Sequence, residues 1–372
     1  MKSIKRSNLA RVVAFFLTAL ILTCSVAFVS AEWQNQAPNQ PDSSETDGNT
    51  SPNGNADENK DGINNKDEDI PTVSPTPEFL HPFTGKEISS EDAYKRPLCF
   101  VYDSNSALYG ISSSFLTVEI PTEDGSTRFI AFQSNCDSGK IGTLATTRDY
   151  ITDFVGAFGG ILFAYGNDDS FNYNKIGKTT VLDFESTIGY HYTEYSKYPY
   201  TNSDLINAFL RNTSTNLIDT EIKIAPWLFT PLGSERKTPR KRAENVIIEY
   251  GGSYTSELIY YSETGKYILN KMGQPKLDLL TDEVLAYDNA FILFANTTTY
   301  ETEKATECVF DTLSGGKGYY ITSGGYEEIT WGYGESGNLI IWSASGEMLE
   351  INRGNSYISF VKSSDMSKIV IS

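Results

Sequence analysis

The feature that most constrains the fold is a series of short runs that alternate polar with apolar residues through the last third of the chain. These runs are NVIIEYGG, ELIYYS, YILNKM, AFILFAN, GYYITS, NLIIWS and SYISFVK. Turn-forming residues such as Glu263-Thr264-Gly265, Ser336-Gly337-Asn338 and Ser345-Gly346 separate them. Alternating β-branched and aromatic residues between turn formers are typical of strands in an antiparallel sheet. The sequence therefore predicts an antiparallel β-rich domain over residues 243–372.

Residues 79–232 combine strand patterns with helix patterns. The strand-like runs are RPLCFVYDS, FLTVEIPT, RFIAFQS, ILFAYGN and TTVLDF. Residues 147–158 have helical spacing, and Asn202-Ser203 precede a second helical run, DLINAFLR. Strands interspersed with helices predict a mixed α/β sandwich domain here, which makes the fold class of the whole body α+β. A basic loop that includes Arg236 and Arg242 follows, and its composition favours a solvated domain joint over a phosphate site.

The N-terminus has the pattern of an export signal. Four basic residues precede an uncharged apolar run over residues 12–29, so residues 1–31 are expected to be a signal peptide or a membrane anchor. Three outcomes stay open: cleavage after Ala31, an uncleaved anchor, or lipidation of Cys24 within a sequence that resembles a lipobox. Each predicts an extracytoplasmic protein, either anchored to the membrane at the cell surface or secreted.

Residues 32–78 are rich in Asn, Asp, Glu, Ser, Pro and Gly, and predict a disordered acidic linker. The positions Asp57, Asn59, Asp61 and Glu68 match the ligand spacing of an EF-hand calcium loop. No amphipathic helix flanks this loop, and so acidic a composition produces such matches by chance. The alternatives are therefore a weak calcium site and no cofactor at all.

Charge and composition exclude several function classes. The net charge is −18, whereas nucleic-acid binding needs a concentrated basic face. The two histidines, His81 and His191, lie in no Ser or Cys motif, so no catalytic triad is expected. Outside the export segment the cysteines are Cys99, Cys136 and Cys308, which leaves a Cys99–Cys136 disulfide and buried free thiols as alternatives.

Several segments between residues 81 and 362 match one family pattern in the correct order. They are HPFTG at 81–85, Arg96-Pro97, residues 100–103, Glu119, residues 123–129, Ile141-Gly142, residues 148–150, residues 273–278, Thr330-Trp331 and residues 354–358. On these segments the chain resembles the YerB-like lipoproteins, a bacterial family of unknown function. The resemblance implies an N-terminal and a C-terminal conserved domain.

The chain departs from this family pattern at polar positions where a site would be sought. Thr143 stands where the family has Pro, and Ala145 where it has Arg. Tyr200 and Thr201 replace a His-Asn pair, and Lys276 replaces a His. If the family has a site at these positions, the resemblance implies that it is altered or lost here.

The densest group of charged residues gives the candidate ligand-binding set. Its members are Asp103, Glu119, Glu123, Arg128, Arg148 and Asp149. Two carboxylates at one sheet end could hydrolyse a glycan, while two arginines could clamp a phosphate or carboxylate. The alternative is a structural Glu–Arg network without chemistry.

Two function classes remain from the sequence. The favoured one is a non-catalytic envelope module that binds a wall ligand or a protein partner and contacts the membrane through its N-terminus. The other is an extracytoplasmic hydrolase that acts on cell-wall glycan with Glu119 or Glu123 and Asp103. The scarcity of histidine favours the binding module.

Overall fold

A computed structural model describes most of the body of the chain. It covers residues 79–165, 180–183, 191–193, 196–212, 215–218, 227–236, 241–301, 306–334 and 337–372. The export segment with Cys24, the acidic linker, and the calcium motif with Asp57, Asn59, Asp61 and Glu68 lie outside these residues. Within the described ranges, no helix is both long enough and apolar enough to cross a membrane.

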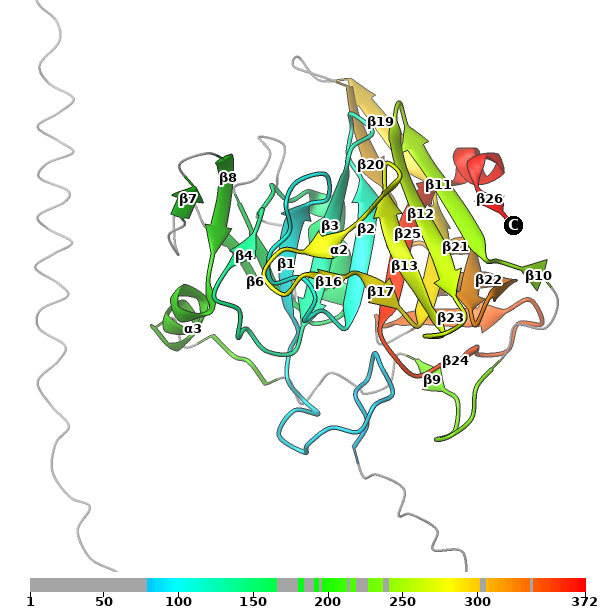
Figure 1. Cartoon of the computed structure of the whole chain (residues 1–372), viewed down its shortest axis with the longest axis horizontal. Helices are drawn as coiled ribbons and strands as arrows, with labels where there is room; N and C mark the ends of the chain where they lie inside the picture. Colours follow the sequence, from blue (N-terminus) through cyan, green and yellow to red (C-terminus); the bar gives the residue numbers. More distant parts are fainter. Residues whose placement is uncertain are drawn as a thin grey trace, which may run out of the picture. The chain divides into compact units, whose positions relative to one another are not determined.

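The largest element of the described body is an eleven-stranded sheet (Figure 1). In spatial order its strands are β10 (Lys241–Arg242), β22 (Gly325–Tyr333), β21 (Gly316–Thr322), β18 (Asn289–Ala295), β25 (Ser356–Lys362), β2 (Leu116–Pro121), β3 (Thr127–Gln133), β1 (Leu98–Asp103), β5 (Ile161–Ala164) and β6 (Thr180–Asp183), with β23 (Leu339–Ser343) paired to β22. Strands from both sequence halves thus share one sheet. The last of them, β25, joins the halves because it pairs in parallel with β18 and with β2. These parallel pairings depart from the antiparallel arrangement expected for the C-terminal half.

A second, six-stranded sheet comes from the C-terminal half. It consists of β14 (Gln274–Pro275), β13 (Lys266–Lys271), β12 (Tyr254–Tyr261), β11 (Asn245–Gly251), β26 (Val370–Ile371) and β17 (Ala286–Tyr287). The smaller sheets are β15 (Leu277–Asp278) with β16 (Glu283–Val284), β19 (Thr297–Glu301) with β20 (Thr306–Phe310), β9 (Leu228–Phe229) with β24 (Glu350–Ile351), and β4 (Ile141–Gly142) with β8 (Ser196–Thr201) and β7 (His191–Thr193). Short turns join β11, β12 and β13 in the antiparallel order that the alternating runs predict.

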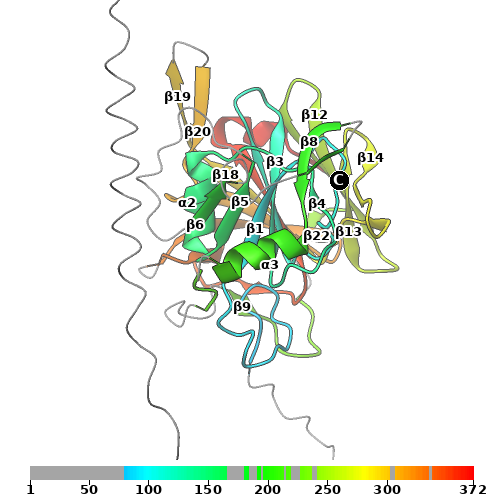
Figure 2. The same cartoon turned by 90° about the vertical axis from the view of Figure 1, so that its left-hand side faces the viewer.

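The middle of the large sheet, from β18 to β1, is buried on both faces. Along β1, Cys99 and Val101 belong to one hydrophobic cluster, while Leu98 and Phe100 belong to the other. Successive side chains of a strand point to opposite faces, so the two clusters cover the two sides of the sheet. Helix α2 (Asp149–Ala157) covers one side and the six-stranded sheet covers the other (Figure 2). Burial on both faces explains why the sequence of β1 is a nearly continuous apolar run.

The expected helices are confirmed. The helical run at 147–158 forms α2, and the second run forms α3 (Ser203–Asn212). Asn202 begins α3 as its cap, because its side-chain oxygen accepts the backbone N–H of Leu205 at 3.0 Å. In the C-terminal half, the only helix among the described residues is a six-residue 3-10 helix, η3 (Ser363–Lys368).

The described fold is predominantly β with α2 and α3 added, which agrees with α+β at the level of class. The N-terminal segment contributes parallel pairs, β1–β5 and β5–β6, to the large sheet. A separate N-terminal sandwich stays a prediction. Cys99, Cys136 and Cys308 are free and buried, so the disulfide alternative is wrong and the thiols pack as small apolar groups.

Candidate functional site

Residues 103–107, called the β1 turn below, leave the large sheet at the end of β1. Asp103 organises this turn with both carboxylate oxygens. Its Oδ1 accepts the backbone N–H of Asn105 at 3.0 Å, and its Oδ2 accepts the Ser106 hydroxyl at 2.9 Å. A carboxylate that bonds the backbone two residues on is a common turn device. Asp103 therefore has a structural task that uses both of its oxygens.

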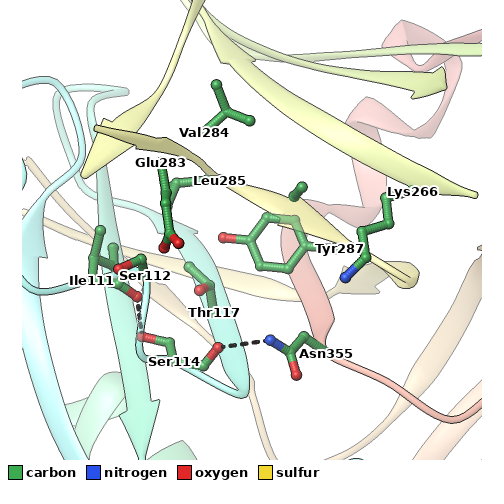
Figure 3. A pocket seen from close by; sticks show the side chains of 11 residues that line it. Ile111, Ser112, Ser114, Thr117, Lys266, Glu283, Val284, Leu285, Tyr287 and Asn355 are labelled. Carbon is green, nitrogen blue, oxygen red and sulfur yellow. Dashed lines mark hydrogen bonds between the residues drawn. The ribbon is translucent and has the colours of Figure 1, made fainter. Parts of the chain in front are cut away.

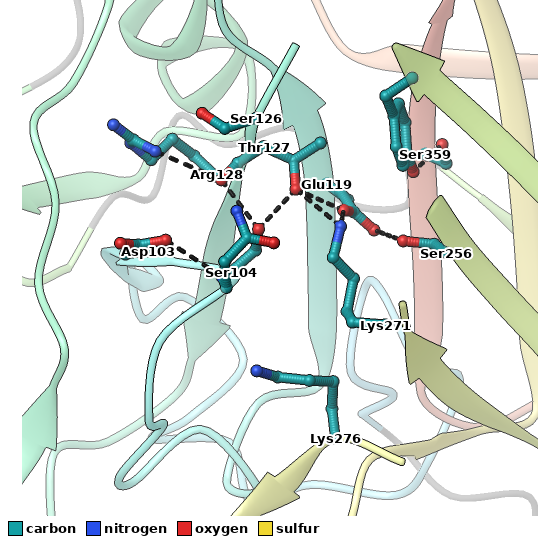
Figure 4. A network of polar contacts seen from close by, with 12 residues as sticks. Asp103, Ser104, Glu119, Ser126, Thr127, Arg128, Ser256, Lys271, Lys276 and Ser359 are labelled. Carbon is teal, nitrogen blue, oxygen red and sulfur yellow. Dashed lines mark hydrogen bonds and ion pairs between the residues drawn. The ribbon is translucent and has the colours of Figure 1, made fainter. Parts of the chain in front are cut away.

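A polar network runs inward from the β1 turn to a buried ion pair (Figure 4). Ser104 Oγ lies 2.5 Å from Thr127 Oγ1, and Thr127 donates to Glu119 Oε1 at 2.5 Å. The Lys271 ammonium donates to the same Glu119 oxygen at 2.5 Å and to Thr127 Oγ1 at 3.0 Å. Both charged side chains are inaccessible to solvent, with exposed fractions of 1% and 0%. This is an internal ion pair that links the two sequence halves.

The second oxygen of Glu119 is also occupied. Ser256 donates to Oε2 at 2.7 Å, and the Tyr357 hydroxyl donates to the same atom. Burial alone would raise the pKa of Glu119, but the Lys271 charge and the hydrogen bonds together hold it below its ordinary value. Glu119 is thus a fixed, ionised group of the interior and lacks the access that a catalytic acid needs.

Glu123 and Arg148 form a second ion pair within the predicted site. Arg148 Nε donates to Glu123 Oε1 at 2.8 Å, and its Nη2 donates to Oε2 at 2.9 Å. Both side chains are mostly buried, and Arg148 immediately precedes helix α2, which begins at Asp149. Within the predicted charge cluster, Glu123 and Arg148 thus pair with each other, a contact of the kind expected for a structural Glu–Arg network.

Arg128 is the predicted site residue with donor capacity left over. It lies opposite Asp103 in the β1–β3 register, and its Nη1 donates to Thr127 O at a long 3.4 Å. Its Nε atom is buried without a hydrogen-bond acceptor in the described residues. An unsatisfied buried donor costs free energy, and the Arg128 guanidinium therefore has donor capacity that the described residues do not use.

Lys276, one of the positions that depart from the family pattern, lies beside the same turn. Its ammonium donates to Ser106 O at 2.9 Å, and Thr143, another departing position, donates to Ala107 O at 2.8 Å. Burial, and next the Lys271 charge, lower the pKa of Lys276 to about 8. The side chains of Lys276 and Thr143, which both differ from the family pattern, thus contact the backbone of the β1 turn. Figure 4 shows Asp103 of this turn between Arg128 and Lys276.

The basic loop that follows the N-terminal half is neutralised where it is described. Arg236 makes a bidentate pair with Glu327, with both contacts at 3.0 Å. Lys241 pairs with Glu328 at 2.7 Å, so this loop is fastened along the acidic strand β22. The described residues also gather no group of three or more His, Cys, Asp or Glu side chains that could hold a metal ion.

Sequence reasoning missed Lys271, although a signal for it exists. In β13 the side chains of Tyr267 and Leu269 point inward, and Lys271 follows at the same period of two. A lysine at an inward position needs a buried anion, and Glu119 supplies it. Charged residues are usually exposed, and a prediction made on that basis would place Lys271 and Glu119 at the surface.

Two family models match the chain. One, described as the N-terminal domain of a protein of unknown function (DUF3048), matches residues 83–216. The other, described as the C-terminal domain of the same family, matches residues 246–358. The chain therefore belongs to this two-domain family of unknown function, which is the YerB-like family indicated by the sequence motifs.

Two individual comparisons support this assignment. "Putative lipoprotein YerB" of Bacillus subtilis (strain 168) is 24% identical over an alignment of 302 residues, and the match covers 77% of this chain and 88% of that protein. The crystal structure of YerB protein from Bacillus subtilis matches with a TM-score of 0.68 and 21% identity, over 79% of this chain and 99% of that chain. At this identity the structural similarity shows a shared fold.

Proposed function

We propose that this chain is a membrane-tethered, extracytoplasmic binding module that holds an anionic group of an envelope ligand at the β1 turn. The observation that carries the proposal is the buried Nε of Arg128, which has no acceptor in the described residues. A guanidinium offers several donors in a planar fork that suits phosphate and carboxylate oxygens. Lys276, held half-buried beside the turn, would supply the second positive charge.

The proposed location has two supports. The basic residues followed by an apolar run at the N-terminus have the pattern of an export signal, with Cys24 as the lipidation candidate. The Bacillus subtilis relative has the description "Putative lipoprotein YerB". The acidic linker at residues 32–78 would hold the body away from the membrane surface.

A binding role is favoured over hydrolysis because the candidate catalytic carboxylates are committed elsewhere. Glu119 is fully buried in its ion pair with Lys271, and Glu123 is held at both oxygens by Arg148. Asp103 uses both oxygens to fix the β1 turn. A glycosidase needs two carboxyl groups that reach the substrate from opposite sides of the scissile bond.

The test is a titration of the full-length chain, held in detergent, with a glycerol-phosphate polymer and separately with a polyprenyl phosphate. The Arg128→Ala/Lys276→Ala double variant should lose at least about tenfold in affinity, the equivalent of one or two charged hydrogen bonds. The matched control is Arg242→Ala/Lys317→Ala, which removes the same charge from exposed positions. Equal affinity in both double variants would overturn the anionic site.

A further inference from the structure

A pocket of about 400 Å³ lies between segments of the two sequence halves, and no residue of the β1 turn lines it. Figure 3 shows its walls. One wall consists of the loop at residues 111–114 and Thr117 of β2, and the other of β16 and β17. Lys266 at the start of β13 and Asn355 before β25 complete it. The volume is within the range of small-molecule sites.

The walls of this pocket are fixed before any ligand arrives. The buried carboxylate of Asp278 accepts the backbone N–H groups of Gly110, Ser112 and Leu280, each at 2.9 Å, and so ties the loop of the N-terminal half to the β15–β16 hairpin. On the inner side, the Tyr287 ring packs on Tyr357 with centroids 5.4 Å apart. Tyr357 in turn donates to Glu119, so the pocket residue Tyr287 packs directly on a member of the buried network.

The polar groups around the pocket have loose internal contacts. The Lys266 ammonium is 3.5 Å from Asp288, and Asn355 Nδ2 is 3.4 Å from Ser114 O. The Glu283 carboxylate is 3.4 Å from the Thr281 hydroxyl. All these distances exceed the usual range for strong hydrogen bonds, so these donors and acceptors are available to a ligand. In Figure 3 the Tyr287 hydroxyl points toward the Glu283 carboxylate, and Lys266 lies on the other side of the Tyr287 ring.

The balance of charge narrows the ligand class. Lys266 and Glu283 carry opposite charges, and the Lys266 ammonium is also paired at 3.5 Å with Asp288, so the pocket offers an anion no unpaired positive charge. Burial raises the pKa of Tyr287, which keeps its hydroxyl neutral. The hydroxyls of Ser112 and Thr117 both donate and accept, as the hydroxyls of a sugar do. Aliphatic side chains, including Leu285, line the remainder and suit the C–H face of a sugar ring.

We infer that this pocket binds an uncharged, hydroxyl-rich ligand of the saccharide class, at a site separate from the anionic site proposed at the β1 turn. The two sites would recognise a ligand that carries both a sugar and an anionic group. Either site can exist without the other. The inference rests on the geometry of the pocket, the opposite charges on its rim and the mixture of hydroxyl and aliphatic lining.

The test uses the β-1,4-linked disaccharide of N-acetylglucosamine, titrated into the full-length chain in detergent and followed by ligand-observed NMR and calorimetry. Wild-type protein should bind it, and Glu283→Ala and Lys266→Ala should each weaken the affinity about tenfold. Both side chains make only long contacts, so neither change should impair folding. Glu347→Ala and Lys317→Ala, at exposed positions outside the pocket, are the matched controls.

Three results would overturn the inference: no binding of the disaccharide at tens of millimolar, equal loss in the pocket and control variants, or preference for the zwitterionic dipeptide alanyl-alanine over the disaccharide. The Arg128→Ala/Lys276→Ala variant separates the two proposals, because it should keep its affinity for the uncharged disaccharide. If this variant binds the anionic ligand more weakly but binds the disaccharide as the wild type does, the pocket is a saccharide site that does not depend on the β1-turn site.

Discussion

At the scale of single residues, the ion pair between Glu119 and Lys271 dominates the interior. Lys271→Met should lower the free energy of unfolding by about 3–5 kcal/mol, because it leaves a buried carboxylate without its counter-charge. The double variant Glu119→Gln/Lys271→Met should be less destabilised than Lys271→Met alone, since Gln is neutral. Its one oxygen can accept from Thr127 or from Ser256, and its amide group can donate to the other hydroxyl. Urea unfolding measures each variant.

The control for this prediction is Lys241→Met, which removes an exposed lysine from its pair with Glu328. Exposed ion pairs contribute little to stability, so the unfolding midpoint should hardly change. If the exposed and the buried lysine proved equally dispensable, the internal pair would not be the stabilising contact that its geometry indicates.

His81 makes stability depend on pH. Its Nδ1 accepts the backbone N–H of Phe83 at 3.2 Å, and its ring lies 4.4 Å from the ring of Phe115. Burial, and next the Lys86 charge, lower its pKa from 6.5 to about 4. The unfolded chain therefore binds a proton between these pH values that the folded chain refuses, and stability falls as the pH falls through this window.

We predict a loss of up to about 3 kcal/mol between pH 6.5 and pH 4 from this residue, by proton linkage. The variant His81→Asn keeps an acceptor for Phe83 but does not titrate. Its unfolding free energy should vary less with pH across the window, whatever its absolute stability. Parallel pH profiles for wild type and variant would contradict the assignment.

At the scale of elements, helix α2 fastens strands from both halves. The Phe154 ring lies 6.3 Å from Phe132 of β3 and 5.2 Å from Phe360 of β25. Phe154→Ala should destabilise the fold by about 3–5 kcal/mol, because it leaves a cavity in a fully buried cluster. Tyr300→Ala, on an exposed strand, is the control for loss of an aromatic ring. Thermal denaturation of both variants distinguishes the two positions.

At the scale of the whole molecule, the body should unfold in one cooperative transition. The large sheet crosses from one sequence half to the other at β25, and both hydrophobic clusters contain residues of both halves. Neither half can lose its packing without exposing the core of the other. Tryptophan fluorescence and far-ultraviolet circular dichroism should give coincident urea curves for the full-length chain. Two separated transitions would show that the halves fold independently.

The candidate site was only partly accessible to sequence reasoning. Charge clustering and the family resemblance selected Glu119 and Arg128, but not the partner of the first or the open donor of the second. Lys271 is 152 residues from Glu119 along the chain, so no local pattern connects them. Arg148 and Glu123 were both selected from the sequence, but only the fold shows that they pair with each other.

The sequence by itself determined the local secondary-structure elements, the family and the expected extracytoplasmic localisation. Strand and helix preferences depend on residues within a few positions of one another, so the runs that became β1, β13 and α2 were recognisable in isolation. Only the tertiary structure decided the parallel placement of β25, the pairing of charges and the pocket of about 400 Å³. These features depend on distances between segments far apart in the chain, which periodicity and composition do not encode.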